Sequence, residues 1–519
     1  MAADPVLEDE VAFARIILGG LEEIDLQKQR RRQRQKNLWL GADLFVASII
    51  VVAVIMGIFI PLPKNLPPVI GVSVAWNKHA EIVMGGQYQG TSMLGTFPID
   101  SFGKQDFFVA GCDTFGQILW LKTFGSAGGN DYLTKITLDH EDNIIITGGL
   151  FDSAFVGDRY IRAVGKANDG EGDFFVAKLN PGGEVLWLDH SGGMFVAHQQ
   201  TGTNMGTAVT VDKANNVIAT GMYIGSPKLG HVTLPVGGPN EDLYLAKYDA
   251  RGKLLWATAA TCDYNIYANS ISTDPKGNIY LSGFFGHHNL SGKAYFKNIT
   301  LQSYGGRDIF IAKYNPNGKL LWARQAGSPN RNSQDYGRGI TADSSDNCFV
   351  TGWFEGAPVF ADTLEKHWGK RDVFLAKYDS GGNLLWVNTM GGKHNDQGNT
   401  VCLDQEGNVY CAGHFSEEAT FGSRMMKSRG DNDIFIVKYN KDGIFQWAKH
   451  TGSTGAEWQM DSAHDLSIGV NGLFVLTGMF SGQEIYFEDQ IIAPKGGKGV
   501  FMIFFDKDGN FKKVEILPV

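Results

Sequence analysis

The sequence predicts an all-β fold, a seven-bladed β-propeller built from four-stranded blades. Two different hairpin patterns alternate along the chain, and each of them occurs seven times. Sixty-six glycines and 12% aromatic residues are typical of many turns and of broad apolar sheet faces. Only 19% of the residues are charged, and the composition as a whole fits poorly with long helices or with disorder.

The first hairpin pattern is clearest in the segment DIFIAKYNPNGKLLW at residues 308–322. Copies lie at residues 173–187, 242–256, 372–386 and 433–447, with weaker copies at 106–120 and 499–513. Each copy contains two short alternating strands around a tight turn, where a glycine supplies the positive φ that the hairpin needs. The seven turn glycines are Gly116, Gly183, Gly252, Gly318, Gly382, Gly443 and Gly509.

The second hairpin pattern lies between the copies of the first, for example ISTDPKGNIYLSGFF at residues 271–285. Its landmark is a glycine followed two positions later by an aromatic ring. The landmark occurs at Gly86/Tyr88, Gly149/Phe151, Gly221/Tyr223, Gly283/Phe285, Gly352/Phe354, Gly413/Phe415 and Gly478/Phe480. Four antiparallel strands cannot bury both of their faces alone, so the units must stack, and closure into a ring removes the exposed edges. A closed ring of seven blades follows, with long, variable connections such as 188–207 and 286–307 at one mouth.

Both hairpin patterns resemble the SBBP-type β-propeller repeat, with its D-x-φ-φ-x-K-φ-x-x-x-G-x-φ-φ-W and D-x-x-G-N-φ-Y-φ-T-G elements, over about residues 72–519. The resemblance implies a fold and an extracytoplasmic address, but no reaction. The GKLLW segments are also similar to the tryptophan-docking repeats of quinoprotein dehydrogenases and of outer-membrane-assembly propeller lipoproteins. This chain lacks the adjacent Cys-Cys pair of those dehydrogenases and, near the start of its apolar run, the lipobox cysteine of those lipoproteins.

An apolar segment at residues 38–60 predicts one transmembrane helix. It is interrupted only by Asp43, and its length matches a hydrocarbon core of about 30 Å. Six Lys and Arg residues precede it between residues 28 and 36, whereas the first positive charges after it are Lys64 and Lys78. This asymmetry keeps the N-terminus in the cytoplasm and places the rest of the chain in the periplasm or outside the cell. A cleaved signal peptide is the alternative, but its charged region would be unusually long and no A-x-A-like site follows.

The predicted order of segments is a cytoplasmic tail at 1–37, the transmembrane helix at 38–60, a Pro-rich linker at 61–71 and the propeller at 72–519. Within the tail, an amphipathic helix is predicted from the spacing of Leu7, Val11, Ala14, Leu18 and Leu21. Either this helix docks on a partner or on the inner leaflet, or the tail is frayed and periodic by chance.

A possible cation site lies at acidic residues that precede the inner strands of four blades. They are Asp131, Asp335, Asp396 and Asp461, with Asn204 at the corresponding position of a fifth blade. Gathered near one mouth of the ring, the four carboxylates could hold Ca²⁺, which prefers several oxygen ligands. We favour the alternative that each side chain caps a backbone turn in its own blade, because structural capping would also repeat around a ring.

Three further sets of repeated residues are interpreted as structural. Turn formation is expected of Asp139, Asp212, Asp274, Asp343 and Asp404. A polar role at strand edges is expected of Lys178, Lys247, Lys313, Lys377 and Lys438, with a basic binding stripe as the alternative. Packing between blades is expected of Trp120, Trp187, Trp256, Trp322, Trp386 and Trp447, with a sugar-binding platform as the alternative.

No sequence feature indicates an enzyme or a bound cofactor. The 12 histidines form no HExxH or H-x-H pattern, and no GxSxG, P-loop or dinucleotide motif stands out. The five cysteines form no CxxC pair, and the net charge of -9 argues against nucleic-acid binding. We therefore expect a protein-interaction scaffold anchored in a membrane complex. A carbohydrate- or cation-binding module is the alternative, and a quinoprotein-like enzyme is the least favoured.

Overall fold

The computed structural model describes residues 70–518, except residues 152, 158, 162–171, 192–203, 237–239, 455–460, 481, 483 and 494–498. All helix or strand structure in this part of the chain is β-strand. Within it, no helix has the length and apolar character needed to cross a membrane. The predicted transmembrane helix at 38–60 and the predicted helix of the tail lie outside the described residues.

Seven four-stranded antiparallel sheets follow one another in chain order, and each sheet is one blade with strands a to d from the centre outwards. The a strands are β1 (Ile70–Trp76), β5 (Tyr132–Leu138), β11 (Met205–Val211), β17 (Asn265–Thr273), β23 (Tyr336–Ala342), β29 (Gln397–Leu403) and β35 (Ser462–Ile468). The b strands are β2 (Ile82–Leu94), β6 (Ile144–Leu150), β12 (Val217–Tyr223), β18 (Ile279–Gly286), β24 (Cys348–Phe354), β30 (Val409–Phe415) and β36 (Phe474–Phe480).

The c strands are buried over most of their length, as expected for strands that are covered on both faces. They are β3 (Phe97–Cys112), β9 (Asp173–Leu179), β15 (Asp242–Tyr248), β21 (Arg307–Tyr314), β27 (Asp372–Tyr378), β33 (Asp433–Tyr439) and β39 (Gly499–Phe505). The outer d strands are β4 (Ile118–Ser126), β10 (Val185–His190), β16 (Leu254–Cys262), β22 (Leu320–Gly327), β28 (Leu384–Gly392), β34 (Phe445–Thr454) and β40 (Phe511–Pro518).

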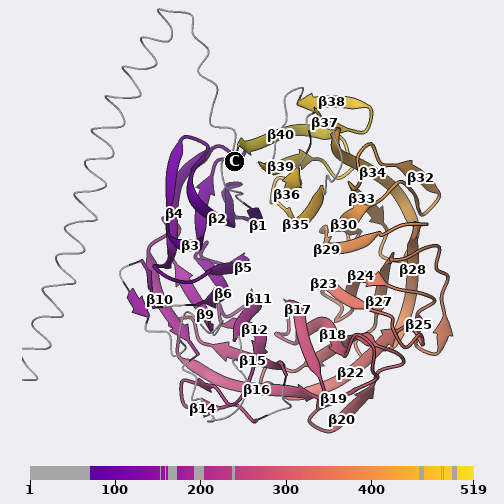
Figure 1. Cartoon of the computed structure of the whole chain (residues 1–519), viewed down its shortest axis with the longest axis horizontal. Helices are drawn as coiled ribbons and strands as arrows, with labels where there is room; N and C mark the ends of the chain where they lie inside the picture. Colours follow the sequence, from indigo (N-terminus) through magenta and orange to yellow (C-terminus); the bar gives the residue numbers. More distant parts are fainter. Residues whose placement is uncertain are drawn as a thin grey trace, which may run out of the picture. The chain divides into compact units, whose positions relative to one another are not determined.

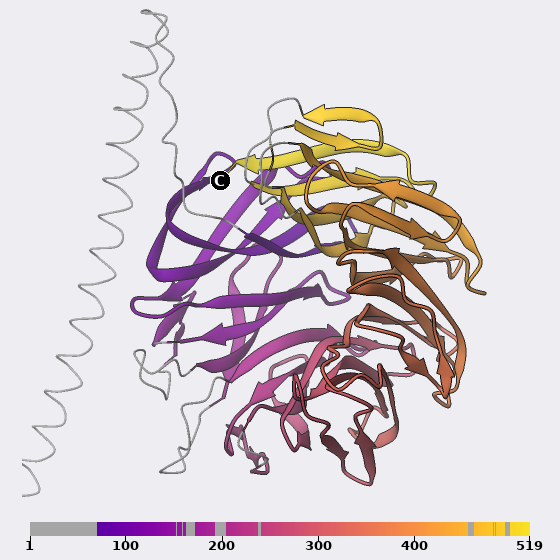
Figure 2. The same cartoon turned by 45° about the vertical axis from the view of Figure 1, so that its right-hand side comes forward.

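The blades are arranged around a ring, which confirms the predicted seven-bladed propeller. Figure 1 shows the a strands on the inner side of the ring, and Figures 1 and 2 both place the first and last blades side by side. Every blade consists of strands that are close in sequence, so the ring closes without exchanging a strand between blades 1 and 7. Closure relies on side chains instead, and Trp76 packs edge-on against Phe504 with 6.2 Å between ring centroids.

Short hairpins between strands b and c tie blades to the blade before them. In five blades such a hairpin pairs with the end of strand d of the preceding blade. The five are β7 (Ala154–Val156) with β8 (Arg159–Ile161), β19 (Lys293–Phe296) with β20 (Ile299–Gln302), β25 (Val359–Phe360) with β26 (Thr363–Leu364), β31 (Glu418–Phe421) with β32 (Arg424–Lys427), and β37 (Glu484–Phe487) with β38 (Gln490–Ala493). In blade 3, β13 (Lys228–Leu229) and β14 (Val232–Thr233) form a separate two-stranded sheet. The predicted long connection at 286–307 therefore contains a hairpin.

The hydrophobic core lies between neighbouring blades. Leu245 of β15 and Leu281 of β18, for example, belong to one buried cluster that joins blades 3 and 4. Leu375 of β27 and Cys411 of β30 belong to another, which joins blades 5 and 6. Because burial of one such side chain contributes about 1.5–3 kcal/mol, each blade depends on its two neighbours for most of its stability.

One predicted landmark is wrong by one residue. In blade 2 the strand register pairs Leu133 with Gly148, at the place where the other six blades pair their landmark glycine. The landmark of blade 2 is therefore Gly148 and Leu150, not Gly149 and Phe151. The adjacent glycines hid this register, and the second position is aliphatic in this blade.

Candidate functional site

Each predicted mouth acid caps backbone groups, as the favoured interpretation expected, but the capped groups are not confined to the acid's own blade. Asp335 is fully buried. Its Oδ2 accepts a hydrogen bond from the backbone N–H of Ser328 (2.6 Å), which follows strand d of blade 4. Its Oδ1 accepts one from the N–H of Glu355 (2.8 Å), which follows strand b of blade 5. Asp131 and Asp396 make the same two contacts, and Asp461 accepts the first of them.

The structure does not bring these four acids together. Each lies at a different blade boundary, and its oxygens already accept bonds from backbone N–H groups. In the described part of the chain, no three His, Cys, Asp or Glu side chains converge in a way that could hold a metal ion. The geometry therefore gives no support to a shared cation site made by Asp131, Asp335, Asp396 and Asp461.

A second buried carboxylate stands beside each of the four. These partners belong to strand c and are Asp106, Asp308, Asp372 and Asp433. In each partner Oδ2 accepts backbone N–H bonds, as in the 2.7 Å bond from Tyr304 to Asp308, while Oδ1 is buried without a hydrogen-bond partner. A Cβ added to Gly391 would lie 2.1 Å from Oδ1 of Asp372 and 3.0 Å from Oδ2 of Asp396. The two carboxylates therefore approach each other over this glycine.

Two buried carboxylates this close do not both ionise without a large free-energy cost. Burial raises the pKa of Asp106 and of Asp396 to about 7, and the charge of the paired acid adds to both rises. Burial, followed by the charge of Asp335, also raises the pKa of Asp308 well above its usual value. The raised pKa values indicate that the pairs Asp106/Asp131, Asp308/Asp335 and Asp372/Asp396 share one proton up to about pH 7, and the pKa of about 6 for Asp433 places the fourth pair lower. The shared proton is best placed on the unpartnered Oδ1 of the strand c acid. A protonated Oδ1 can donate a hydrogen bond to the neighbouring mouth acid, whose ionised carboxylate can only accept.

Two other blade boundaries carry a neutral residue in place of the mouth acid. Asn204 occupies the position of Asp335 between blades 2 and 3, and Ile266 occupies it between blades 3 and 4, with the same backbone bond to the preceding blade. The Asn204 amide has the shape of a protonated carboxyl group and, like it, can both donate and accept a hydrogen bond, whereas the Ile266 side chain can do neither. The position therefore does not require two negative charges, which supports a shared proton over a divalent cation.

The acids of the a–b turns form turns, as predicted. Oδ1 of Asp139 accepts hydrogen bonds from the backbone N–H groups of Glu141 (2.8 Å) and Asn143 (2.9 Å). The same pair of bonds is made by Asp212, Asp274, Asp343 and Asp404.

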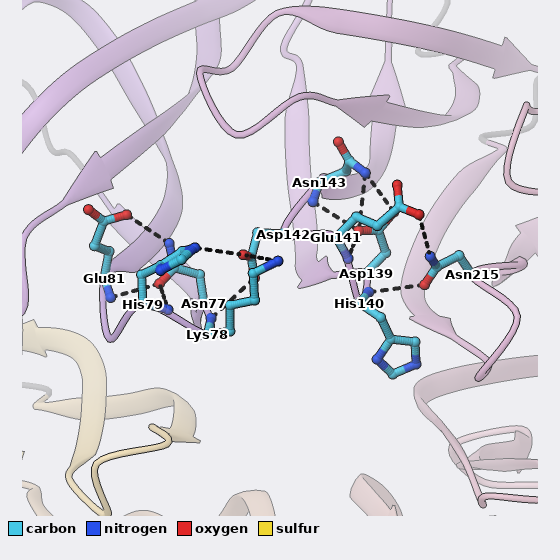
Figure 3. A network of polar contacts seen from close by, with 10 residues as sticks. All are labelled: Asn77, Lys78, His79, Glu81, Asp139, His140, Glu141, Asp142, Asn143 and Asn215. Atoms are coloured by element: carbon cyan, nitrogen blue, oxygen red, sulfur yellow. Dashed lines mark hydrogen bonds and ion pairs between the residues drawn. The ribbon is translucent and has the colours of Figure 1, made fainter.

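The a–b turns of blades 1 to 3 are also linked to one another, as Figure 3 shows. Asp142 accepts a bond from the backbone N–H of Lys78 (3.1 Å) and pairs with its ammonium group (3.2 Å), and Asn215 accepts one from His140 (3.0 Å). Asp142 and Asn215 have φ values of 63° and 59°, in the left-handed region that short polar residues tolerate. Unlike glycine, they have side chains that reach the turn of the preceding blade.

The strand lysines are buried, so the prediction that they are polar residues at strand edges is wrong. Lys178 pairs with Asp139 at 2.6 Å and donates to the carbonyl oxygen of Ala250 in the next blade (3.4 Å). Nε1 of Trp187 donates to the same carbonyl oxygen at 3.1 Å. In three further blades one carbonyl oxygen binds both side chains, in the pairs Lys247/Trp256, Lys313/Trp322 and Lys377/Trp386. The lysine and the tryptophan of one blade are therefore both hydrogen-bonded to the same carbonyl oxygen of the next blade.

The predicted packing of the tryptophans between blades is confirmed. An added Cβ on the turn glycine Gly252 would come within 2.6 Å of the Trp187 indole, and the other five turn glycines from Gly183 onwards meet a tryptophan of the preceding blade in the same way. Glycine is therefore needed at this turn both for its positive φ of 85° and for the close approach of the ring.

Replacement of Asp139 by Ala is expected to lower the free energy of unfolding by about 3–5 kcal/mol, because it leaves the buried Lys178 ammonium without its counter-charge. Asp343→Ala is the matched control, since Asp343 makes the same turn bonds while Lys377 of its blade lies over the ring of Phe349. That variant should lose only about 1 kcal/mol. Urea denaturation of both variants measures the difference, and equal losses would contradict the role given to the ion pair.

A stack of aromatic side chains crosses the boundary of blades 4 and 5 close to the a strands. The rings of Tyr267, Phe284, Tyr336 and Trp353 follow one another with centroid separations of 4.8, 4.2 and 4.5 Å. The guanidinium group of Arg307 lies 5.1 Å from the centroid of Phe284. Such contacts contribute about 0.5–2 kcal/mol each, so the stack fixes blades 4 and 5 rigidly together.

The sequence patterns did not reveal this stack. The landmark of the second hairpin pattern drew attention to Phe285 and Phe354, whereas the stack uses the residues just before them, Phe284 and Trp353. Successive side chains of a strand point to opposite faces, so the two sets lie on different sides of the sheet. The additional rings at Phe284 and Trp353 were the signal that could have found it.

The outer strand d of every blade contains a β-bulge directly before the tryptophan position. A bulge adds one residue that has no partner across the ladder and re-aims its side chain. In five blades this residue is a leucine with 44–55% of its surface exposed: Leu119, Leu186, Leu255, Leu321 and Leu385. In blades 6 and 7 it is Gln446 and Lys512, which are also exposed. We call these seven positions the rim.

Comparison with known families agrees with the fold. Residues 321–353 match the Beta-propeller repeat family, SBBP, which confirms the resemblance read from the motifs. A WD repeat-containing protein, L264, of Acanthamoeba polyphaga mimivirus is 23% identical over 77% of this chain and 34% of its own length. Regulatory protein FlaEY of Caulobacter vibrioides is 30% identical over 27% of this chain and 15% of its own length. The chain thus spans about a third or less of either relative.

Solved structures resemble this chain only distantly. A protein of unknown function from Dyadobacter fermentans has 10% sequence identity and a TM-score of 0.33 over 75% of this chain and 95% of its own. A leech intramolecular trans-sialidase has 10% identity and a TM-score of 0.28 over 87% of this chain and 67% of its own. Similarity at this level transfers no activity.

Proposed function

We propose that this β-propeller repeat protein is a protein-interaction scaffold without enzymatic activity, held in a membrane complex by the segment at 38–60. The exposed leucines of the rim are the observation that carries the proposal. They recur at one structural position, on the outermost strand of five blades.

The fold itself does not account for these leucines. Gln446 and Lys512 occupy the same position in blades 6 and 7, so a polar residue is compatible with the bulge and the strand. An exposed leucine on an edge strand is a liability for aggregation unless another surface covers it. Five such leucines around one ring are best explained by partners that pack against the rim.

The other repeated positions are occupied by contacts within the ring. The turn acids, the strand lysines and the tryptophans bind neighbouring strands and turns. The rim is therefore the repeated surface that remains available to another protein. A rigid ring that offers one apolar side chain per blade suits a scaffold, because rigid frameworks hold contact residues in fixed positions.

Joint replacement of Leu186, Leu255 and Leu321 by Gln is expected to remove bound partners without changing the stability of the propeller. Each exposed substitution should change the free energy of unfolding by no more than about 0.5 kcal/mol. The full-length chain is extracted in mild detergent, and its complex is measured by size-exclusion chromatography and quantitative mass spectrometry. The variant should elute as the free chain, whereas wild type elutes in a larger complex.

Val470→Gln provides the control, since Val470 is 64% exposed in an a–b turn away from the rim. It should retain the partners. If the triple variant keeps its partners at wild-type amounts, the rim is not the interaction surface and the proposal fails.

A further inference from the structure

The a strands carry a second repeated bulge, and its residues line a ring of hydrogen bonds around the centre. In four blades the bulged side chain donates to a backbone carbonyl oxygen of the next a strand: Thr134 to Gly206 (2.7 Å), Thr207 to Ala268 (2.5 Å), Asn269 to Gly337 (2.8 Å) and Asn399 to Ala463 (2.8 Å). His464 donates from Nδ1 to Gly71 (2.5 Å) and so closes the ring between blades 7 and 1. Five of the polar side chains at this bulge are therefore used in hydrogen bonds that join neighbouring blades.

Arg338 occupies the same bulge in blade 5 and breaks the pattern. It lies in β23 between Gly337 and Gly339, its side chain is exposed, and no described residue forms a hydrogen bond or an ion pair with it. An exposed side chain on the innermost strand of a closed ring faces the central channel. Arg338 is thus a guanidinium group that the channel wall surrounds but does not neutralise.

The a strands offer no free carboxylate to pair with Arg338. The seven a strands contain a single acidic residue, Asp465. Oδ2 of Asp465 already accepts bonds from Lys135 Nζ (2.7 Å), Ser73 Oγ (2.7 Å) and the N–H of Val74 (3.0 Å). Glu355, which follows strand b of the same blade as Arg338, accepts a bond from Arg371 Nε (3.0 Å). The positive charge of Arg338 remains uncompensated in the described part of the chain.

Two histidines stand close enough to Arg338 to feel its charge. Burial lowers the pKa of His414 to about 4 and also lowers that of His464, and the charge of Arg338 contributes to both. Both rings are therefore neutral at pH 7. The amide Nδ2 of Asn399 contacts Nδ1 of His414 at 3.5 Å, which makes Nδ1 the acceptor and leaves the proton of His414 on Nε2. His414 can then act as a donor.

We propose that the central channel binds an oxyanion, a carboxylate or a phosphate group, at Arg338, with His414 as an additional donor. A guanidinium group binds both groups through two parallel N–H bonds, and the Nε2–H of neutral His414 adds a donor without a second charge, whereas the N–H of His464 is already bonded to Gly71. This site goes beyond the interaction scaffold, since it lies in the channel and not on the rim. It would take a small anion or an acidic group carried by a larger ligand.

The test compares acetate and inorganic phosphate with chloride at constant ionic strength, on the full-length chain. Either oxyanion is expected to raise the melting temperature, and isothermal titration calorimetry should detect binding. Arg338→Gln should weaken that binding at least tenfold. Arg251→Gln, at an exposed turn arginine, should leave it unchanged.

Arg338→Lys covers the case in which the Gln variant does not fold, because it keeps the charge and loses the two-bonded geometry. It should bind the anion several-fold more weakly than wild type. A response to acetate alone identifies a carboxylate site, and a response to phosphate alone identifies a phosphate site. The proposal is overturned if wild type responds to neither anion more than to chloride, or if the Lys variant binds as tightly as wild type.

Discussion

Removal of residues 499–519 is expected to unfold the entire propeller. The deleted segment contains β39 and β40, the c and d strands of blade 7. Val500, Met502 and Phe504 of β39 pack into the cluster shared with blade 1, and Phe501 and Ile503 pack into the cluster shared with blade 6. The deletion therefore removes both neighbours' contacts at once and leaves a bare strand edge on β36.

The size of this effect follows from burial. Loss of five fully buried large side chains costs on the order of 10 kcal/mol, which equals or exceeds the whole stability of a typical domain. Far-UV circular dichroism and limited proteolysis of the truncated chain measure the outcome, and complete digestion is expected. A chain that ends at Leu517 is the control, because Leu517 is the last residue in the closing cluster. A folded, protease-resistant truncated chain would show that the ring does not need closure.

The repeats made the ring predictable because each blade has to solve the same packing problem. Turn glycines such as Gly252 and docking tryptophans such as Trp187 must recur wherever one blade meets the next, so their spacing counts the blades. The hairpins β19–β20 and β31–β32 were not predicted. They are short, they differ in sequence, and they are stabilised by pairing with strand d of another blade, which no local pattern records.

The polar positions were harder to interpret than the apolar ones. Lys178 looks like an exposed lysine in the sequence, and only the fold shows that Asp139 and the Ala250 carbonyl meet its ammonium group. Arg338 was also hidden, since its significance depends on the partners that the other bulge residues find and that it lacks. Both cases depend on contacts between residues that are about 40 or more positions apart.

The paired acids at the blade boundaries explain why pH is expected to control stability. The folded state holds a proton on three of the Asp–Asp pairs up to about pH 7, as the pKa values of Asp106, Asp335 and Asp396 indicate, and on the fourth up to about pH 6, as the pKa of Asp433 indicates. The unfolded chain releases the same protons near pH 4. Folding therefore takes up protons between these values, and the free energy of unfolding falls as pH rises through this window.

Histidines oppose this trend at lower pH. The lowered pKa values of His414 and His464 mean that the unfolded chain binds protons below about pH 6.5 that the folded chain does not. Glu488, with a pKa lowered to about 2, loses its stabilising ionised form only under much more acidic conditions. The interval from pH 8 to 6.5 consequently isolates the acid pairs.

The melting temperature of wild type is expected to rise as pH falls from 8 to 6.5. Between pH 8 and 6.5 each pair with a pKa of about 7 contributes roughly 1 kcal/mol, and the three such pairs together produce a measurable rise. Asp308→Asn tests the cause, because its amide can donate to Asp335 at every pH while its oxygen keeps the bond from Tyr304. The variant should be at least as stable as wild type at pH 8 and should show a smaller rise on acidification. Asp508→Asn, at an exposed turn, should follow the wild-type profile, and a wild-type melting temperature that is flat or falls from pH 8 to 6.5 would exclude the shared protons.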